Sequence, residues 1–308
     1  MRSLHDKIST IVLKRMQLLG VRAGFALASV VAPRAAIRHA ARLFCTPFGN
    51  SRWRALATAT PEAREDALEV DGLRLVTYVW GDPTTQPYVL FAHGWSSHGT
   101  RVVPWVAPLQ QAGYAVVAFD QAAHGKSDGA RTTLPDFAHH LYAVGAHYGP
   151  AAAVLGHSLG AAAAAIALAN GLQARRAVLI APPADPLLMA DQFAGVVGLA
   201  RHLARRMFAQ FERRMRFRVE ELQAQHVAPR IARPALIVHD LEDREVAWSE
   251  GERYARFWND SRLLTTRGLG HHRIAENAGV IGAALRFLRG ERVGERVVSS
   301  PNLPYGWA

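Results

Sequence analysis

Short apolar runs alternate with helix-like segments through most of the chain after residue 68. Turn-forming residues such as Gly81-Asp82-Pro83 separate these runs, and the segments between them are long enough for helices. Apolar strands that alternate with helices predict an α/β fold with a mostly parallel central sheet and helices on both faces. We expect strands at Leu73–Trp80, Tyr88–Ala92, Ala115–Phe119, Ala151–Leu155, Ala177–Ile180, Ala235–His239 and Arg262–Thr265, and helices at Val102–Gln111 and Ala161–Asn170.

The first sixty residues do not follow this alternation. Their apolar residues lie at helical spacing, but the most apolar stretch, Ala23–Ala32, is half the length of about 20 residues that a membrane-spanning helix needs. Lys14 and Arg15 interrupt the apolar run, which argues against a secretory signal. Two interpretations stay open: this helix packs on the body of the protein, or its basic amphipathic face lies on a membrane surface.

A second departure lies between two expected strands, from Pro182 to Arg233. It contains an Arg-rich segment with a single apolar stripe of residues four apart, namely Leu199, Leu203, Met207, Phe211 and Met215. An insertion at this place predicts a helical cap. The expected organisation is an N-terminal helical extension (1–62), an α/β core (63–182 and 231–291), a helical cap insertion (183–230) and a C-terminal tail (292–308).

Composition limits the classes of function. The 308 residues carry a formal charge of +11, mostly from arginine, but no nucleic-acid-binding motif accompanies the charge, so we expect no nucleic-acid partner. Cys45 is the single cysteine, which excludes an intrachain disulfide and agrees with a reducing compartment. A cytoplasmic location is expected, with peripheral membrane contact through residues 1–60 left open.

The strongest chemical motif is Gly156-His157-Ser158-Leu159-Gly160, which fits G-x-S-x-G. An apolar strand leads into it and an alanine-rich helix leads out. The two glycines allow a strand to turn sharply into a helix while the central serine takes a strained conformation. The motif predicts that Ser158 is a nucleophile at the start of a helix.

A serine hydroxyl needs a neighbouring base, and the base in turn needs an acid that fixes its tautomer. The glycine-rich loop after the last strand offers His271, which we prefer to His272. The loop after the Ala235–His239 strand offers two acids, and we prefer Asp243 because Asp240 adjoins the strand end, where it suits turn or helix capping. The order Ser158, Asp243, His271 is that of a nucleophile-elbow hydrolase.

Negative charge that develops on a substrate carbonyl oxygen needs donors already in place. The backbone N–H of Leu159, the residue after the nucleophile, is one expected oxyanion donor. The backbone N–H of Trp95 is the other, because His93-Gly94-Trp95 ends the neighbouring strand. We expect His93 itself to structure the loop rather than to act as a second base.

The set of HGW, FDQAAHGKSDG, GHSLGA, HDLEDREV and GLGHHRI resembles the α/β-hydrolase superfamily over residues 68–290. The resemblance implies the fold, the roles of the triad Ser158, His271 and Asp243, and chemistry without an organic cofactor or a metal. It also implies that Asp120, His124 and Gly125 are structural. Ala122 stands where many relatives have proline.

The resulting prediction is a serine hydrolase that acts on a small-molecule ester through an acyl-enzyme intermediate. Lipase action at a membrane surface, thioesterase, acyltransferase, peptidase and carbon–carbon hydrolase activities share the fold and triad, so they stay open. A non-catalytic scaffold is the alternative from another class. The sequence predicts neither the substrate nor the oligomeric state.

Overall fold

The computed structural model describes residues 4–215 and 217–297, without the side chains of residues 4–15 and 50. Two compact units contain these residues: a helical unit formed by residues up to 45 and 186–221, and a sheet unit formed by residues 46–185 and those from 222 onward. Each unit is built around its own core.

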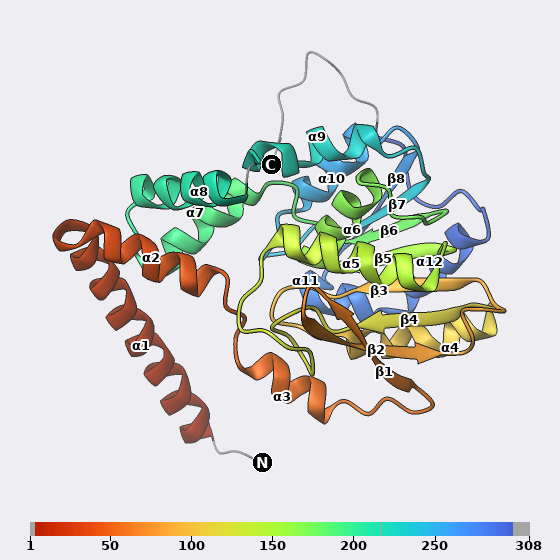
Figure 1. Ribbon diagram of the computed structural model, residues 1–308, viewed down its shortest axis with the longest axis horizontal. Coiled ribbons are helices and arrows are strands. Elements are labelled where there is room, and N and C mark those ends of the chain that lie inside the picture. The colour runs from red at the N-terminus through yellow and green to blue at the C-terminus, as the bar shows by residue number, and fades with distance from the viewer. Residues whose placement is uncertain (1–3, 216, 298–308) are drawn as a thin grey trace. The chain divides into compact units, whose positions relative to one another are not determined.

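The sheet unit has one sheet, which in the described residues has eight strands in the order β1-β2-β4-β3-β5-β6-β7-β8 (Figure 1). β2 pairs antiparallel with both β1 and β4, and all other neighbours are parallel. The strands are β1 (Arg64–Val70), β2 (Leu73–Trp80), β3 (Tyr88–Ala92), β4 (Ala115–Phe119), β5 (Ala153–His157), β6 (Ala177–Ile180), β7 (Ala235–Asp240) and β8 (Ser261–Thr266). The predicted α/β fold with a mostly parallel sheet is confirmed.

Helices of the sheet unit precede, follow and connect these strands. They are α3 (Asn50–Ala57), α4 (Val103–Gln111), α5 (Leu134–Tyr148), α6 (Leu159–Ala169), α9 (Ala224–Val227), α10 (Trp248–Phe257), α11 (Gly270–Arg273) and α12 (Ala278–Leu288), with 3-10 turns η1 (Gly99–Val102), η3 (Ala228–Arg230) and η4 (Ile274–Glu276). A further 3-10 turn, η2 (Val219–Leu222), spans a unit boundary.

Helices cover both faces of the sheet (Figure 1). Val89 and Phe91 of β3 pack in one cluster with residues of α4 and α12. The intervening Leu90 faces α5, because a methyl group added at Gly145 would lie 3.2 Å from its Cδ2 atom. The alternation along one strand therefore divides the helices between the two faces, and both faces of β3 are buried.

The helical unit contains α1 (Leu4–Val31), α2 (Pro33–Phe44), α7 (Pro186–Val197) and α8 (Arg201–Met215). Ile37 of α2 and Leu203 and Met207 of α8 are almost fully buried in its core. The Phe44 ring packs edge-to-face against Phe193 and Phe208. The N-terminal segment and the insertion, which the sequence analysis treats as separate, thus share one apolar core.

Residues 46–62 were predicted to belong to the N-terminal extension, whereas the structure places them in the sheet unit. Arg52 of α3 donates hydrogen bonds to the carbonyl oxygens of Gly125, Ser127 and Gly129. These bonds attach α3 to the loop after β4.

Among the helices that the structure describes, none combines the length and apolar character needed to cross a membrane.

Candidate active site

Ser158 lies at the sharp turn between β5 and α6. Its φ of 54° and ψ of −126° are sparsely populated by residues other than glycine. The glycines on either side allow helix and sheet to approach closely, since a methyl group added at Gly156 would lie 2.5 Å from the Cα atom of Ala161. One added at Gly160 would lie 2.2 Å from the carbonyl oxygen of Ala92. Both clashes involve backbone atoms, so neither glycine is replaceable without moving the turn.

A continuous pair of hydrogen bonds joins three loops at the carboxyl edge of the sheet. The Nε2 atom of His271 lies 2.9 Å from Ser158 Oγ, and its Nδ1 atom lies 2.7 Å from Asp243 Oδ2. A carboxylate only accepts, so Nδ1 carries the proton and the unprotonated Nε2 accepts from the serine hydroxyl. The three residues named from the sequence are thus brought together, and His272 instead pairs with Glu245 at the surface.

The Asp243 side chain is fully buried and accepts several hydrogen bonds. Its Oδ1 atom accepts from the backbone N–H groups of Glu245 and Val246, at 2.8 and 3.0 Å. The Oδ2 atom also lies 3.5 Å from His239 Nε2. Burial alone would raise the pKa of Asp243, but the hydrogen bonds from His239 and His271 outweigh it and hold the pKa well below its usual value. Asp243 is therefore ionised beside the imidazole.

Asp240 connects the loop that carries Asp243 with the loop that carries His271. Its Oδ1 atom accepts from the backbone N–H of Glu242, and its Oδ2 atom accepts from the Thr266 hydroxyl at 2.7 Å and the Leu269 N–H at 3.0 Å. Asp240 is completely buried. Burial opposes ionisation, but these bonds lower the pKa of the carboxyl group. Asp240 was predicted to cap a local turn or helix, whereas its carboxylate also bonds to the loop that carries His271.

His157, the first variable residue of G-x-S-x-G, contacts the main chain of His271. Its Nε2 atom donates to the backbone carbonyl oxygen of His271 at 2.9 Å. Burial lowers the pKa of His157 to about 3, so it is neutral at neutral pH and keeps the tautomer that donates. The roles of His157 and His239 were missed. The four-residue spacing of His239 and Asp243 was the one available signal for the latter.

The two expected oxyanion donors flank the nucleophile. Leu159 is the first residue of α6, where backbone N–H groups have no partner within the helix. Trp95 follows Gly94, and a methyl group added at Gly94 would lie 3.0 Å from Ser158 Cβ. Within the described part of the chain, neither amide donates a hydrogen bond to a protein acceptor. Both are available to a bound carbonyl oxygen.

The loop after β4 is rigidly built. Asp120 is fully buried and accepts from Gly99 N–H, the Tyr78 hydroxyl and Lys126 N–H. A methyl group added at Gly125 would overlap the Asp120 carboxylate. His124 Nε2 accepts from Ser96 N–H and His93 Nε2 accepts from Gln121 N–H. These contacts support the structural roles expected for Asp120, His124 and His93.

The comparisons with known proteins agree with this fold. The family model described as "Serine aminopeptidase, S33" matches residues 83–228. This segment includes the serine turn and ends before the strand that precedes Asp243. No curated protein matches the chain in sequence.

Solved structures match over nearly the whole of their own chains. A putative lipase, Lip1 from Acinetobacter baumannii, has a TM-score of 0.59 and 14% identity, covering 84% of this chain and 96% of its own. Est1E from Butyrivibrio proteoclasticus has a TM-score of 0.56 and 19% identity, covering 73% of this chain and 98% of its own. A membrane phospholipase A, described as a bacterial virulence factor, has a TM-score of 0.58 and 18% identity, covering 92% and 98%.

The strand order and the serine turn are those of an α/β-hydrolase fold, and the family match over residues 83–228 agrees with them. The match to this family supports a hydrolase. Among the described residues, no group of three or more His, Cys, Asp and Glu side chains has the arrangement of a metal site.

Proposed function

We propose that the protein is a serine hydrolase that cleaves carboxylic ester-like bonds through an acyl-serine intermediate. The observation that carries the proposal is the hydrogen-bonded relay from Ser158 Oγ through His271 to Asp243 Oδ2. A serine hydroxyl becomes an effective nucleophile when an adjacent base accepts its proton, and a buried carboxylate supports the charged form of that base.

In the proposed mechanism, His271 Nε2 takes the hydroxyl proton while Ser158 Oγ attacks the ester carbonyl carbon. The oxyanion is bound by the N–H groups of Trp95 and Leu159. His271 then gives its proton to the leaving alkoxide, which departs as an alcohol and leaves the acyl-serine. A water molecule, deprotonated by His271, attacks the acyl-serine, and its proton returns to Ser158 Oγ as the carboxylic acid leaves.

Labelling with a fluorophosphonate probe tests the nucleophile, because such probes phosphonylate an activated serine. We expect the full chain to be labelled and Ser158→Ala not to be labelled. Ser249→Ala removes the hydroxyl of a serine on α10 that forms no bond of the relay, so this variant serves as the matched control and should be labelled like the wild type. Absence of labelling in folded wild-type protein would favour a non-catalytic scaffold instead.

A panel of p-nitrophenyl esters and acyl thioesters of graded chain length separates the activities that share this relay. Fastest release from short oxygen esters supports the carboxylesterase proposal. Preferential turnover of thioesters, or transfer of the acyl group to an added alcohol rather than to water, would replace it by thioesterase or acyltransferase action.

A second candidate is lipid hydrolysis at a membrane surface, and exposed apolar side chains on α1 favour it. Leu19, Leu27, Val30 and Val31 are between 64% and 82% exposed. Interfacial helices present such faces to lipid. The similarity to the membrane phospholipase A covers 92% of this chain, which is compatible with this candidate but fixes only the fold.

Flotation with phosphatidylcholine–phosphatidylglycerol vesicles tests the second candidate. The full chain should float, and replacing Val30 and Val31 with serine should weaken flotation several-fold. Replacing Leu188 and Val196, which are exposed on α7, makes a matched control that removes two apolar side chains elsewhere. Failure of the wild type to float, or equal losses in both variants, would remove this candidate.

A further inference from the structure

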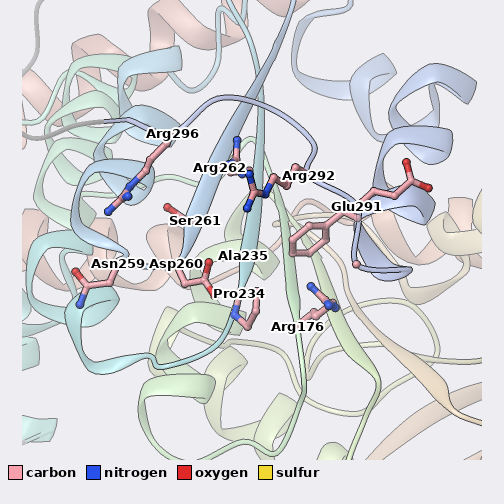
Figure 2. A pocket seen from close by; sticks show the side chains of 12 residues that line it. Arg176, Pro234, Ala235, Asn259, Asp260, Ser261, Arg262, Glu291, Arg292 and Arg296 are labelled. Atoms are coloured by element: carbon pink, nitrogen blue, oxygen red, sulfur yellow. The ribbon is translucent and has the colours of Figure 1, made fainter.

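A pocket of about 550 Å³ lies at the end of the sheet opposite the catalytic loops. It is lined by the residues that begin β7 and β8, Ala235 and Ser261, and by Arg176, which precedes β6 (Figure 2). β7 runs from the pocket to Asp240, a distance of about 17 Å at about 3.3 Å per residue. A molecule in this pocket is therefore remote from Ser158.

Four arginines gather around the pocket: Arg176, Arg262, Arg292 and Arg296. None of them forms an ion pair with a carboxylate among the described residues, although arginines elsewhere do, as Arg253 with Asp185. The carboxylates in the lining are Asp260 and Glu291. The lining thus holds an excess of two positive charges.

Two of the guanidinium groups are held in place by neutral partners. Arg262 donates to the carbonyl oxygen of Gly294 at 3.0 Å, and the guanidinium of Arg176 lies 5.3 Å from the centre of the Phe287 ring. Both side chains are half-buried. Because a guanidinium has five N–H donors, each retains donors for a ligand, and its planar fork matches phosphate oxygens.

We propose that this pocket binds a small molecule through a phosphoryl group. A phosphate monoester carries a charge of about −1.5 to −2 at pH 7 and offers three acceptor oxygens, which matches the excess charge and the number of donors. The volume is within the range of about 300–1,000 Å³ for small-molecule sites, so the pocket also has room for the group that carries the phosphate. The proposed serine-hydrolase activity does not account for this site.

Calorimetric titration of the full chain with inorganic pyrophosphate tests the proposal. We expect saturable binding that weakens as sodium chloride is added, because the attraction is electrostatic. Replacing Arg176 and Arg262 with glutamine should weaken binding at least tenfold. Arg292→Gln with Arg296→Gln is a second variant, and because these two side chains are exposed, it does not rely on the buried anchors for folding.

Arg205→Gln with Arg206→Gln is the matched control, because it also removes two positive charges but from the exposed surface of α8. We expect this control to bind pyrophosphate within twofold of the wild type. Equal weakening in the control and the pocket variants would show diffuse attraction by net charge and overturn the proposal. An absence of saturable binding to the wild type would overturn it too.

The source of the phosphoryl group is separated by vesicle flotation. If the ligand is a lipid headgroup, wild-type protein should float with vesicles that contain phosphatidate, and pyrophosphate and the Arg292→Gln, Arg296→Gln variant should both reduce flotation. Pyrophosphate binding with no such effect on vesicles indicates a free phosphorylated molecule. Fluorophosphonate labelling, unchanged in both pocket variants, confirms that the catalytic edge is intact.

Discussion

The carboxyl edge of the sheet and the core of the helical unit are stabilised in different ways. At the carboxyl edge, the fully buried side chains of Asp120 and Asp240 each accept directed hydrogen bonds from other parts of the sheet unit. In the helical unit the corresponding interior is apolar, with Leu203 and Met207 fully buried. A hydrogen-bond network fixes atoms in one geometry, whereas apolar packing tolerates rearrangement at a smaller cost in function. Substitutions at the edge should therefore mainly change rates, and those in the helical unit should mainly change stability.

Among the changes that leave Ser158 in place, Asp243→Asn is expected to have the largest effect. Asparagine has an NH2 donor in place of one carboxylate oxygen, and this donor would favour an unprotonated Nδ1. His271 would then take the tautomer in which Nε2 carries the proton and cannot accept the serine proton. By analogy with the same change in other triads, the labelling rate should fall by about 10³–10⁴-fold. Stopped labelling reactions measured on a gel provide the rate.

Asp191→Asn, on the exposed surface of α7, is the charge-matched control for Asp243→Asn and should keep the wild-type rate. Circular dichroism establishes that both variants are folded. A labelling rate of Asp243→Asn within tenfold of the wild type would show that this carboxylate does not serve the base.

Leu203→Ala tests the apolar side of the comparison. Loss of this fully buried side chain should cost about 2–5 kcal/mol in the free energy of unfolding, because a cavity remains in the helical core. Urea denaturation followed by tryptophan fluorescence and circular dichroism measures the loss. The exposed Val196→Ala control should change stability by about 0.5 kcal/mol or less. A large loss of labelling by folded Leu203→Ala would contradict the division between the two regions.

Asp240→Asn tests whether the carboxylate that joins the Asp243 loop to the His271 loop positions the Ser158–His271–Asp243 relay. Replacing one acceptor oxygen with an amide removes a partner of Thr266 or Leu269 and lets the His271 loop shift. We expect the maximal labelling rate to fall about 10²-fold, the effect of roughly 1 Å of misplacement, while the probe concentration for half-saturation stays the same.

Thr266→Val removes one of the bonds to Asp240 and should produce a smaller fall in the maximal labelling rate. A loss of stability with an unchanged maximal rate in both variants would mean that Asp240 serves folding alone.

Much of the sheet was predictable from the sequence because its strands are short, apolar and bounded by turn residues. β2, β3, β4 and β6 begin and end at the predicted residues. β5 lies two residues later than expected, since the strand continues through Gly156 to His157 before the turn. β1 was missed because all but one of its residues are at least partly exposed and its sequence, REDALEV, lacks the apolar run used as the signal.

The chemistry of the site was predictable only where a motif fixes it. The serine turn requires glycines by steric exclusion, so a local pattern identifies Ser158. The hydrogen bonds from Asp240 to Leu269 and from His157 to the His271 carbonyl join residues far apart in the chain. Such contacts depend on strand order, which no local pattern contains. The shared core of α2 and α8 was hidden for the same reason.

The smallest expected effect per substituted residue concerns the neutral histidines buried around the carboxyl edge. Burial lowers the pKa of His93, His124 and His157 to about 3 and that of His98 to about 4, against an ordinary value near 6.5. The unfolded chain therefore takes up protons below pH 6.5 that the folded chain does not, so stability must fall as the pH is lowered from about 6.5 towards 4. Each histidine contributes about 1.4 kcal/mol per pH unit in this window.

Urea denaturation from pH 7.5 to 5 measures this dependence. Replacing one of these histidines lowers by about one the number of protons that the chain takes up when it unfolds. His93→Gln should reduce the slope of unfolding free energy against pH by about 1.4 kcal/mol per unit below pH 6. His147→Gln is the control, because that side chain is exposed and should leave the slope unchanged. The helical unit contains none of these four histidines. An equal effect of His93→Gln and His147→Gln would show that the acid sensitivity does not arise from the buried polar edge.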